Sequence, residues 1–179
     1  MSRLGMAIDT RVCLHCEACV VACKAENAVA SGNSRNWVRE SERGAYPALS
    51  VRIEPGQCMQ CDAAPCVRVC PTGASYVGAG GVVLVNLDDC IGCRYCMTAC
   101  PYDARYFDED SGTVDKCTFC AQRVREGLQP ACVLTCPSRA RTFGDLDDRS
   151  SDVAKIIVER GGVPSKPEAG TRPKIFYLS

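Results

Sequence analysis

Residues 90–101 read Cys90-Ile-Gly-Cys93-Arg-Tyr-Cys96-Met-Thr-Ala-Cys100-Pro101, so that four cysteines stand in the spacing C-x2-C-x2-C-x3-C. The same spacing occurs near the start of the sequence, and two further groups of four cysteines have related spacings. The four runs contain all 16 cysteines of the 179 residues: Cys13, Cys16, Cys19 and Cys23 in run one; Cys58, Cys61, Cys66 and Cys70 in run two; Cys90, Cys93, Cys96 and Cys100 in run three; and Cys117, Cys120, Cys132 and Cys136 in run four. The chain therefore repeats one thiol-rich design four times.

The spacing within the runs matches the thiolate ligands of [4Fe–4S] clusters. Such a cube is held by four soft thiolates that approach its corners from different directions, and C-x2-C-x2-C-x3-C is the spacing of bacterial ferredoxins. A proline, at which the chain can turn, follows Cys70, Cys100 and Cys136, whereas Lys24 follows Cys23. Four runs predict four [4Fe–4S] clusters, and several clusters in one small chain indicate that electrons are relayed.

The fourth cysteine of each run is expected to bind a neighbouring cluster, because in two-cluster ferredoxins it ligates the cluster of the other run. Runs two and three lie close in sequence and predict one such pair, and runs one and four then form a second pair around it. We number the four ligand sets after the run that supplies three of the thiolates: set 1 is Cys13, Cys16, Cys19 and Cys136; set 2 is Cys58, Cys61, Cys66 and Cys100; set 3 is Cys90, Cys93, Cys96 and Cys70; set 4 is Cys117, Cys120, Cys132 and Cys23.

Two other uses of the cysteines fit the sequence less well. A disulfide scaffold requires an oxidising compartment, and no signal peptide is visible to take the chain there by itself. Zinc suits isolated C-x2-C pairs, but the first three runs each pack four thiolates into a short stretch. The only histidine, His15, lies inside run one, where it is expected to be a loop residue or a hydrogen-bond donor near sulfur and not a ligand.

The composition limits the possible partners of the chain. Lysine plus arginine and aspartate plus glutamate are equal at 21 each, so that nothing suggests a nucleic-acid partner. Four oxidised cubes with their thiolates add a charge of about −8. Basic residues near the clusters are expected to raise the cluster potentials, and the candidates are Arg94, Arg105, Lys116, Arg139 and Arg141.

The apolar residues support a core that depends on the clusters. The hydrophobic fraction of 46% includes the 16 cysteines, so that folding is expected to be coupled to metal loading and the apo-protein is expected to be largely disordered. No apolar stretch approaches the roughly 18–20 residues that cross a bilayer, so that no direct membrane span is expected.

The repeats predict an α+β fold of two ferredoxin-like two-cluster modules, one nested within the other, in which each repeat is a strand, a cluster loop, a short helix and a strand. Residues 1–23 plus 101–145 are expected to form the outer module, and residues 58–100 the inner module. Residues 24–57 are a connecting segment that either docks a partner or covers the first cluster. Residues 146–179 predict a short helix, capped by Ser151 and ended by Gly161-Gly162, and an extended partner-binding tail.

The sequence resembles a known family over its whole length. The resemblance rests on the order and spacing of the four runs and on five stretches: Cys70-Pro-Thr-Gly-Ala-Ser-Tyr76, Cys100-Pro-Tyr-Asp-Ala-Arg-Tyr106, Lys116-Cys-Thr-Phe-Cys120, Arg141-Thr-Phe-Gly-Asp145 and Gly170-Thr-Arg-Pro-Lys-Ile-Phe-Tyr177. These are similar to the four-cluster iron–sulfur subunits of the dimethyl sulfoxide reductase family, most of all those of polysulfide, thiosulfate and tetrathionate reductases.

The resemblance implies an electron-transfer subunit without catalysis of its own. In such complexes a molybdopterin-containing subunit performs the chemistry and a multi-span membrane subunit exchanges electrons with quinone. One outer cluster is then expected to face each partner. The resemblance also implies a peripheral position on the cytoplasmic membrane, at the periplasmic face through co-export with a partner, or alternatively at the cytoplasmic face. Two other functions stay open, namely the relay subunit of a hydrogenase or other dehydrogenase, and a free multi-cluster ferredoxin.

Overall fold

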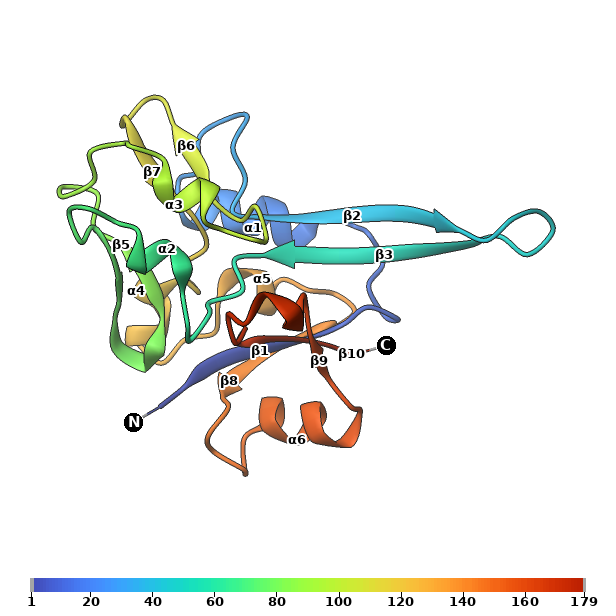
Figure 1. The fold of residues 1–179 in the computed structure, drawn as a ribbon. Coiled ribbons are helices and arrows are strands. Elements are labelled where there is room, and N and C mark those ends of the chain that lie inside the picture. The colour runs from blue at the N-terminus through green and yellow to red at the C-terminus, as the bar shows by residue number, and fades with distance from the viewer. Residues whose placement is uncertain (1, 179) are drawn as a thin grey trace.

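The computed structural model describes residues 2–178 and has a mixed α+β architecture of short elements. Its largest sheet has four strands in the order β8 (Arg141–Asp145), β1 (Leu4–Asp9), β10 (Ile175–Leu178) and β9 (Val163–Pro164). β1 pairs antiparallel with β8 and parallel with β10, so that segments from both ends of the chain form the centre of this sheet (Figure 1).

The predicted repeat of strand, loop, helix and strand is present in the structure. Each cysteine run begins after a strand and reaches a helix within its own length. The four repeats are β1, α1 (Ala18–Glu26) and β2 (Asn36–Arg43); β3 (Ser50–Gln57), α2 (Pro65–Arg68) and β4 (Ser75–Val77); β5 (Val83–Val85), α3 (Tyr95–Thr98) and β6 (Tyr106–Asp108); and β7 (Thr113–Asp115), α4 (Ala121–Arg125), α5 (Ala131–Leu134) and β8.

The strand pairs join consecutive repeats. The strand after each run pairs antiparallel with the strand before the next run, as β2–β3, β4–β5 and β6–β7, and the β1–β8 pair joins the first repeat to the last. The β1–β8 pair is the contact that an outer module of runs one and four requires. β3 pairs with β2 and not with β6, however, so that the strands do not enclose runs two and three in a sheet of their own.

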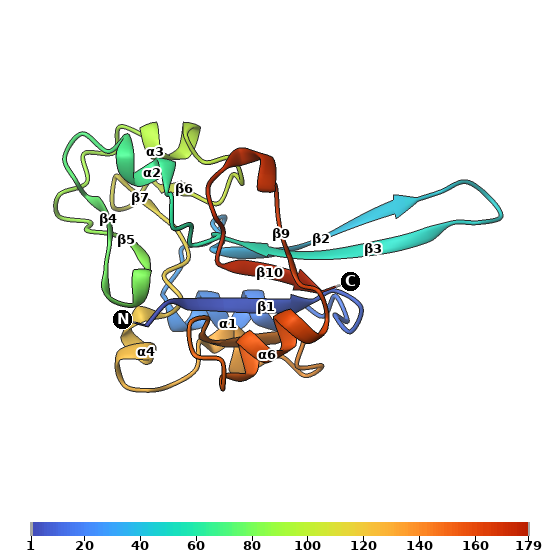
Figure 2. The same cartoon turned by 60° about the horizontal axis from the view of Figure 1, so that its bottom comes forward.

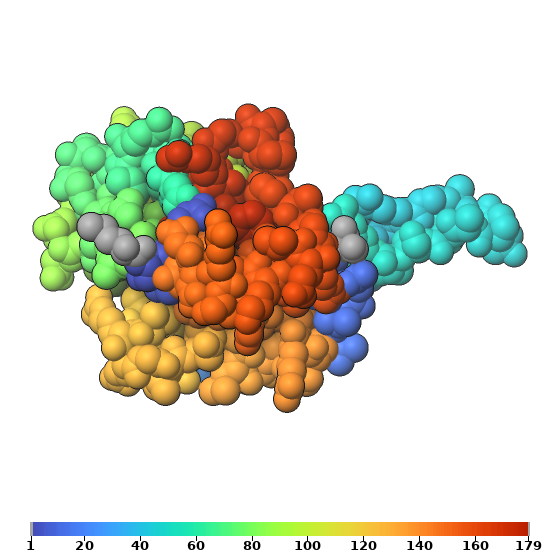
Figure 3. All heavy atoms as spheres, turned by 90° about the horizontal axis from the view of Figure 1, so that it is seen from below, coloured from blue at the N-terminus to red at the C-terminus, as the bar shows by residue number. Residues whose placement is uncertain are grey.

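The β2–β3 hairpin extends well beyond the rest of the molecule, as Figures 1 and 2 show from two directions. Its eight-residue strands pair along their whole length, from Asn36–Gln57 at the base to Arg43–Ser50 near the tip. Seen from below, the tip stands clear of all other segments (Figure 3). Apolar side chains are exposed there, since Tyr46 is 90% exposed and Leu49 and Val51 are also open to solvent.

The last segment of the chain packs on its own sheet. α6 (Asp152–Glu159) is capped by Ser151, whose Oγ accepts a hydrogen bond from the Ala154 amide at 3.3 Å, as the sequence predicts. The following tail lies along run two, where the Lys174 amide donates to the Met59 carbonyl at 3.0 Å. It ends in β10, of which Ile175 and Leu178 are buried. Ile175 and Leu178 of the tail are therefore covered by the chain itself, whereas Val163 is exposed, and a role in binding a partner stays a prediction.

The core contains unusually few large aliphatic side chains. Many of the buried residues are cysteines or small residues, and they are joined by Met6, Ile8, Val83 and Phe119. Phe119 packs edge-on against Phe143 with 5.1 Å between the ring centroids. None of the described helices has the length and apolar character that a membrane crossing requires.

Candidate functional site

The four cysteine loops share one unusual backbone conformation. The second residue after the first cysteine of each run has a positive φ, at His15 (51°), Gln60 (49°), Gly92 (66°) and Phe119 (54°). Left-handed residues within a tight loop turn successive N–H groups towards the inside, and such concave loops bind anionic groups, iron–sulfur clusters among them. Three of these four residues are not glycine, so that the conformation carries a steric cost, as is common at binding sites.

The structure brings together three of the four predicted ligand sets. The four cysteines of set 1 line one cavity, those of set 2 a second and those of set 4 a third. In each case the fourth cysteine comes from another run, as the exchange of ligands predicts. Three cavities with four thiols each indicate that one kind of group fits all three.

The cysteines of set 3 lie close to the surface. Cys96 is buried beside Cys90, while Cys93 is exposed. Cys70, at the end of run two, accepts a hydrogen bond from the Ser75 amide at 3.4 Å. The corresponding cysteine of run four, Cys136, accepts from the Ala140 amide at 3.3 Å. The local geometry of Cys70 thus repeats that of a set 1 ligand, whereas its place in set 3 stays a prediction.

The cysteines suit iron–sulfur clusters better than the two alternatives. All 16 cysteines have free thiols, which does not match a disulfide scaffold. Within residues 2–178 no three His, Cys, Asp or Glu side chains are arranged to hold a single metal ion. The thiols of sets 1, 2 and 4 are instead spread around a cavity, as the corners of a cube require. Nδ1 of His15 lies 2.9 Å from Oε2 of Glu40 on the β2–β3 hairpin, and a role as a donor near sulfur stays a prediction.

Burial keeps several of these thiols protonated until metal binds. Burial raises the pKa of Cys132 to about 11, and it raises the pKa values of Cys23 and Cys61 to about 12, with smaller contributions from neighbouring thiols. Iron binds the thiolate form, so that cluster loading releases protons. The buried thiols therefore depend on the metal for the charged state that they need as ligands.

The neighbours of the buried thiols give the order of the four sets. Burial is the largest cause of the raised pKa values of three cysteines, and a thiol of another set adds to it in each case. These thiols are Cys66 for Cys96, Cys58 for Cys117 and Cys19 for Cys132. Thiols of run three therefore lie near run two, those of run two near run four, and those of run four near run one. The exposure of the thiols agrees with this order, because Cys93 of set 3 and Cys16 of set 1 are exposed, whereas all four cysteines of set 4 are buried.

Three of the five basic residues expected near clusters are buried. Arg105 is 5% exposed, Lys116 0% and Arg141 4%, whereas Arg94 and Arg139 are exposed. Nε and Nη1 of Arg105 are buried without a hydrogen-bond acceptor in the described part of the chain. These unpaired donors beside the cavity of set 2 are explained if sulfur atoms of a cluster accept their hydrogen bonds.

Sequence patterns do not indicate every side chain that reaches the thiols. Nδ2 of Asn27 lies 3.6 Å from Sγ of Cys23 and 3.7 Å from Sγ of Cys120, both of set 4. Arg35 fixes this asparagine by donating from Nη1 to its Oδ1 at 2.8 Å. The only sequence signal for such a role is the position of Asn27. It follows the fourth cysteine of run one at the distance at which Ala74 follows the fourth cysteine of run two.

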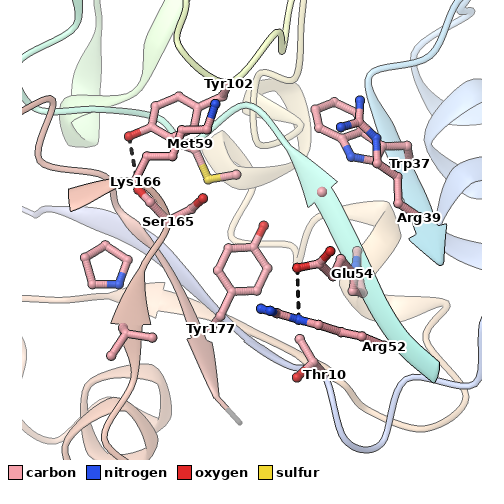
Figure 4. A pocket seen from close by; sticks show the side chains of 14 residues that line it. Thr10, Trp37, Arg39, Arg52, Glu54, Met59, Tyr102, Ser165, Lys166 and Tyr177 are labelled. Atoms are coloured by element: carbon pink, nitrogen blue, oxygen red, sulfur yellow. Dashed lines mark hydrogen bonds and ion pairs between the residues drawn. The ribbon is translucent and has the colours of Figure 1, made fainter. Parts of the chain in front are cut away.

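A separate open groove lies between the base of the hairpin and the tail (Figure 4). Trp37, Arg52 and Tyr177 are among the side chains that line it, and Arg52 pairs with Glu54 at 3.0 Å. The lining contains no cysteine. The groove is therefore distinct from the cysteine-lined cavities.

Comparison with known proteins agrees with the geometry. Residues 49–146 match a family described as 4Fe-4S dicluster domain, and residues 12–74 match a second family of the same description. One chain of the polysulfide reductase of Wolinella succinogenes is 42% identical, over 98% of this protein and 94% of its own length. This protein belongs to the iron–sulfur subunits of the dimethyl sulfoxide reductase family. It holds four [4Fe–4S] clusters, which agrees with two dicluster regions and 16 cysteines.

Two further relatives carry different substrate names. The arsenate respiratory reductase iron–sulfur subunit of Shewanella sp. (strain ANA-3) is 38% identical, over 98% of this protein and 96% of its own length. A subunit of the tetrathionate reductase of Salmonella typhimurium is 41% identical, over 98% of this protein and 72% of its own length. The relatives are therefore subunits of reductases that are named for different substrates.

Proposed function

We propose that this chain transfers electrons through four [4Fe–4S] clusters between two partner subunits of a respiratory oxidoreductase complex. The observation that carries this proposal is that thiols of runs three, two, four and one lie near one another in that order, with exposed thiols in runs three and one. Electrons that enter at one exposed set can pass through the two interior sets and leave at the other. Each cubane has four thiolates in this arrangement, so that no iron is open to a substrate and the chain is not itself catalytic.

The partners follow from the family. One terminal cluster, at set 1 or set 3, faces a molybdopterin-containing catalytic subunit, and the other faces a multi-span membrane subunit that reacts with quinone. Exposed apolar side chains lie beside both terminal sets, namely Leu14 (65% exposed) near Cys16 and Ile91 (67%) and Tyr95 (64%) around Cys93. Apolar residues around an exposed redox centre support close docking of a partner.

The ligand sets also support the nested arrangement of the two modules. Sets 1 and 4 exchange their fourth cysteines across the outer pair of runs, and the cavity of set 2 already contains Cys100 of run three. In this proposal residues 1–23 plus 101–145 form the outer module and residues 58–100 the inner module. The strand pairs agree with these bounds, because β1–β8 and β6–β7 lie within the outer module, β4–β5 within the inner module and β2–β3 within the connecting segment.

The β2–β3 hairpin is the proposed docking element of the connecting segment 24–57. It projects from the molecule and exposes Tyr46, Leu49 and Val51 at or near its tip (Figure 3). An isolated hairpin with exposed apolar side chains is stable only when its base or another surface supports it. The hairpin therefore fits a role in holding a partner subunit.

In this proposal the complex lies peripherally on the membrane, on the periplasmic face.

Anaerobic affinity isolation from native membranes, with mass spectrometry of the proteins that co-purify, tests this function. A molybdopterin-type large subunit together with a multi-span membrane subunit is the expected result. Isolation of a hydrogenase subunit, or of the chain alone with about 16 irons, would contradict it. Protease accessibility in spheroplasts tests the location, because a periplasmic protein is digested from outside and a cytoplasmic one is protected.

A further inference from the structure

Two buried arginines occupy equivalent positions in the third and fourth repeats. Arg105 stands five residues after Cys100, directly before β6, and Arg141 stands five residues after Cys136, at the start of β8. An alanine precedes each of them, at Ala104 and Ala140. Both arginines are nearly inaccessible to solvent, although arginine is rarely fully buried without a charged partner.

The Arg105 guanidinium lies between two ligand sets. Burial acts to lower its pKa, but the thiolates of Cys66 and Cys58 in set 2 and of Cys96 in set 3 outweigh burial and raise it. Its Nη2 donates to the neutral Oγ of Ser75 at 2.7 Å, while Nε and Nη1 have no acceptor in the described part of the chain. The positive charge therefore faces two sets of thiolates at once.

The Arg141 guanidinium has the same relation to the other two sets. Burial acts to lower its pKa, and the thiolates of Cys132 in set 4 and Cys19 in set 1 raise it. Nη2 lies 3.8 Å from Sγ of Cys19, and Nη1 donates to the neutral Oε1 of Gln57 at 2.6 Å. Gln57 is itself fully buried, so that the guanidinium is held in one orientation.

We propose that Arg105 and Arg141 are positioning residues for charge, each of which raises the reduction potentials of two neighbouring clusters together. Arg105 acts on the clusters of sets 2 and 3, and Arg141 on those of sets 4 and 1. A guanidinium is always protonated, and a fixed charge in a poorly hydrated interior acts more strongly than one at the surface. A positive charge favours the reduced form of a cluster, because reduction adds one electron to an anionic cube.

The arrangement divides the electron path into two halves. Within each half one guanidinium serves both clusters, so that their potentials rise together and the step between them keeps its driving force, while buried Lys116 faces thiols of sets 2 and 4 at the boundary between the halves. The step from set 2 to set 4 joins the halves. This inference rests on the ligand sets of the proposed function, and it adds which clusters respond to which residue.

The test is an EPR-monitored redox titration of the assembled complex that carries Arg105→Gln or Arg141→Gln. Arg141→Gln is expected to lower two of the four midpoint potentials and leave the other two unchanged, and Arg105→Gln is expected to lower the other two. Arg139→Gln and Arg94→Gln are matched controls, because each removes an exposed charge next to a cysteine ligand. Neither control is expected to shift a pair of clusters.

Iron content separates failure of this inference from failure of the proposed function. About 16 irons and four EPR signals in the unmodified complex establish the clusters, after which only the pattern of shifts tests the arginines. A shift of one cluster, of all four, or of the same pair in both variants overturns the inference. If a glutamine variant does not assemble, Arg141→Lys and Arg105→Lys keep the charge and are expected to give smaller shifts in the same two separate pairs, and any other pattern again overturns it.

Discussion

The Arg35 guanidinium pairs with the Asp115 carboxylate at 2.7 Å and so joins the segment after run one to the strand before run four. Both side chains are largely buried, at 13% and 14% exposed. The Tyr106 hydroxyl donates to the same carboxylate oxygen at 2.6 Å. Arg35 in turn holds Asn27, so that the ion pair supports the environment of set 4.

Replacement of Asp115 by asparagine is expected to destabilise the loaded protein. The substitution removes the charge that compensates Arg35, and a hydrogen bond to a charged group contributes about 2 kcal/mol. For a chain of this size the loss lowers the melting temperature by roughly 4–8 °C. Anaerobic thermal unfolding followed by circular dichroism measures it. Glu109→Gln, at an exposed position in the same β6–β7 hairpin, is the control, and an equal effect in both variants would refute the prediction.

Replacement of Asn27 by alanine is expected to lower the potential of one cluster only. Its Nδ2 group is close to two thiols of set 4, and hydrogen bonds to sulfur raise the reduction potential of a cluster. An EPR-monitored titration measures the four potentials. Asn33→Ala, in the same segment, serves as the control. A shift of two clusters would show that Asn27 acts more widely than its contacts indicate.

The exchange of ligands predicts that Cys100 and Cys61 serve the same cluster although they belong to different runs. Cys100→Ser and Cys61→Ser are therefore expected to alter the same EPR signal, with loss of one iron from that cube. Cys70→Ser and Cys93→Ser are expected to alter a second, different signal. If Cys100→Ser instead alters the signal that Cys93→Ser alters, the ligands are not exchanged between runs two and three.

Substitution at the hairpin tip is expected to abolish assembly without loss of clusters. The triple variant Tyr46→Ser, Leu49→Ser and Val51→Ser removes exposed apolar surface from the outer part of a hairpin that projects from the molecule. Co-purification of partner subunits is expected to fall at least about tenfold, which corresponds to 1.4 kcal/mol of binding free energy. Val158→Ser, at an 82% exposed position on α6, is the control. Normal co-purification of the triple variant would exclude the tip from the interface.

Removal of iron is expected to unfold most of the chain. Half of the cysteines are buried around the cavities, and an empty cavity forfeits the contacts of its lining. Far-UV circular dichroism after anaerobic treatment with a chelator and an oxidant measures the loss of structure, and reconstitution with iron and sulfide is expected to restore it. A compact apo-protein that melts cooperatively is the outcome that contradicts this expectation.

The spacing of the cysteines predicted the repeated strand, loop and helix, because each run constrains only its own short segment. The spacing, together with the exchange of the fourth cysteine between paired runs, predicted which cysteines line the cavities of sets 1, 2 and 4. It could not predict the pairing of β3 with β2, since both partners are eight-residue segments outside the ligand spacing. Nor did it distinguish buried Arg141 from exposed Arg139, because two residues of sequence separation do not reveal which side chain points inward at the start of β8.

The tail shows the same limit of local patterns. Its apolar residues indicated a surface to bind, and the structure supplies one in β1, which is almost the whole sequence away. Likewise, Asn27 lies near Cys120 only because α1 packs against α5 and the surrounding loops. Contacts between distant segments depend on the assembled repeats, and single motifs do not contain them.

The position of β1 between β8 and β10 has a consequence for biosynthesis. β1 is translated well before both of its neighbours, which belong to residues 141–178. β1 therefore has no strand partner while residues 10–140 are being translated. A nascent chain cannot complete this sheet before β8 and β10 have both been synthesised.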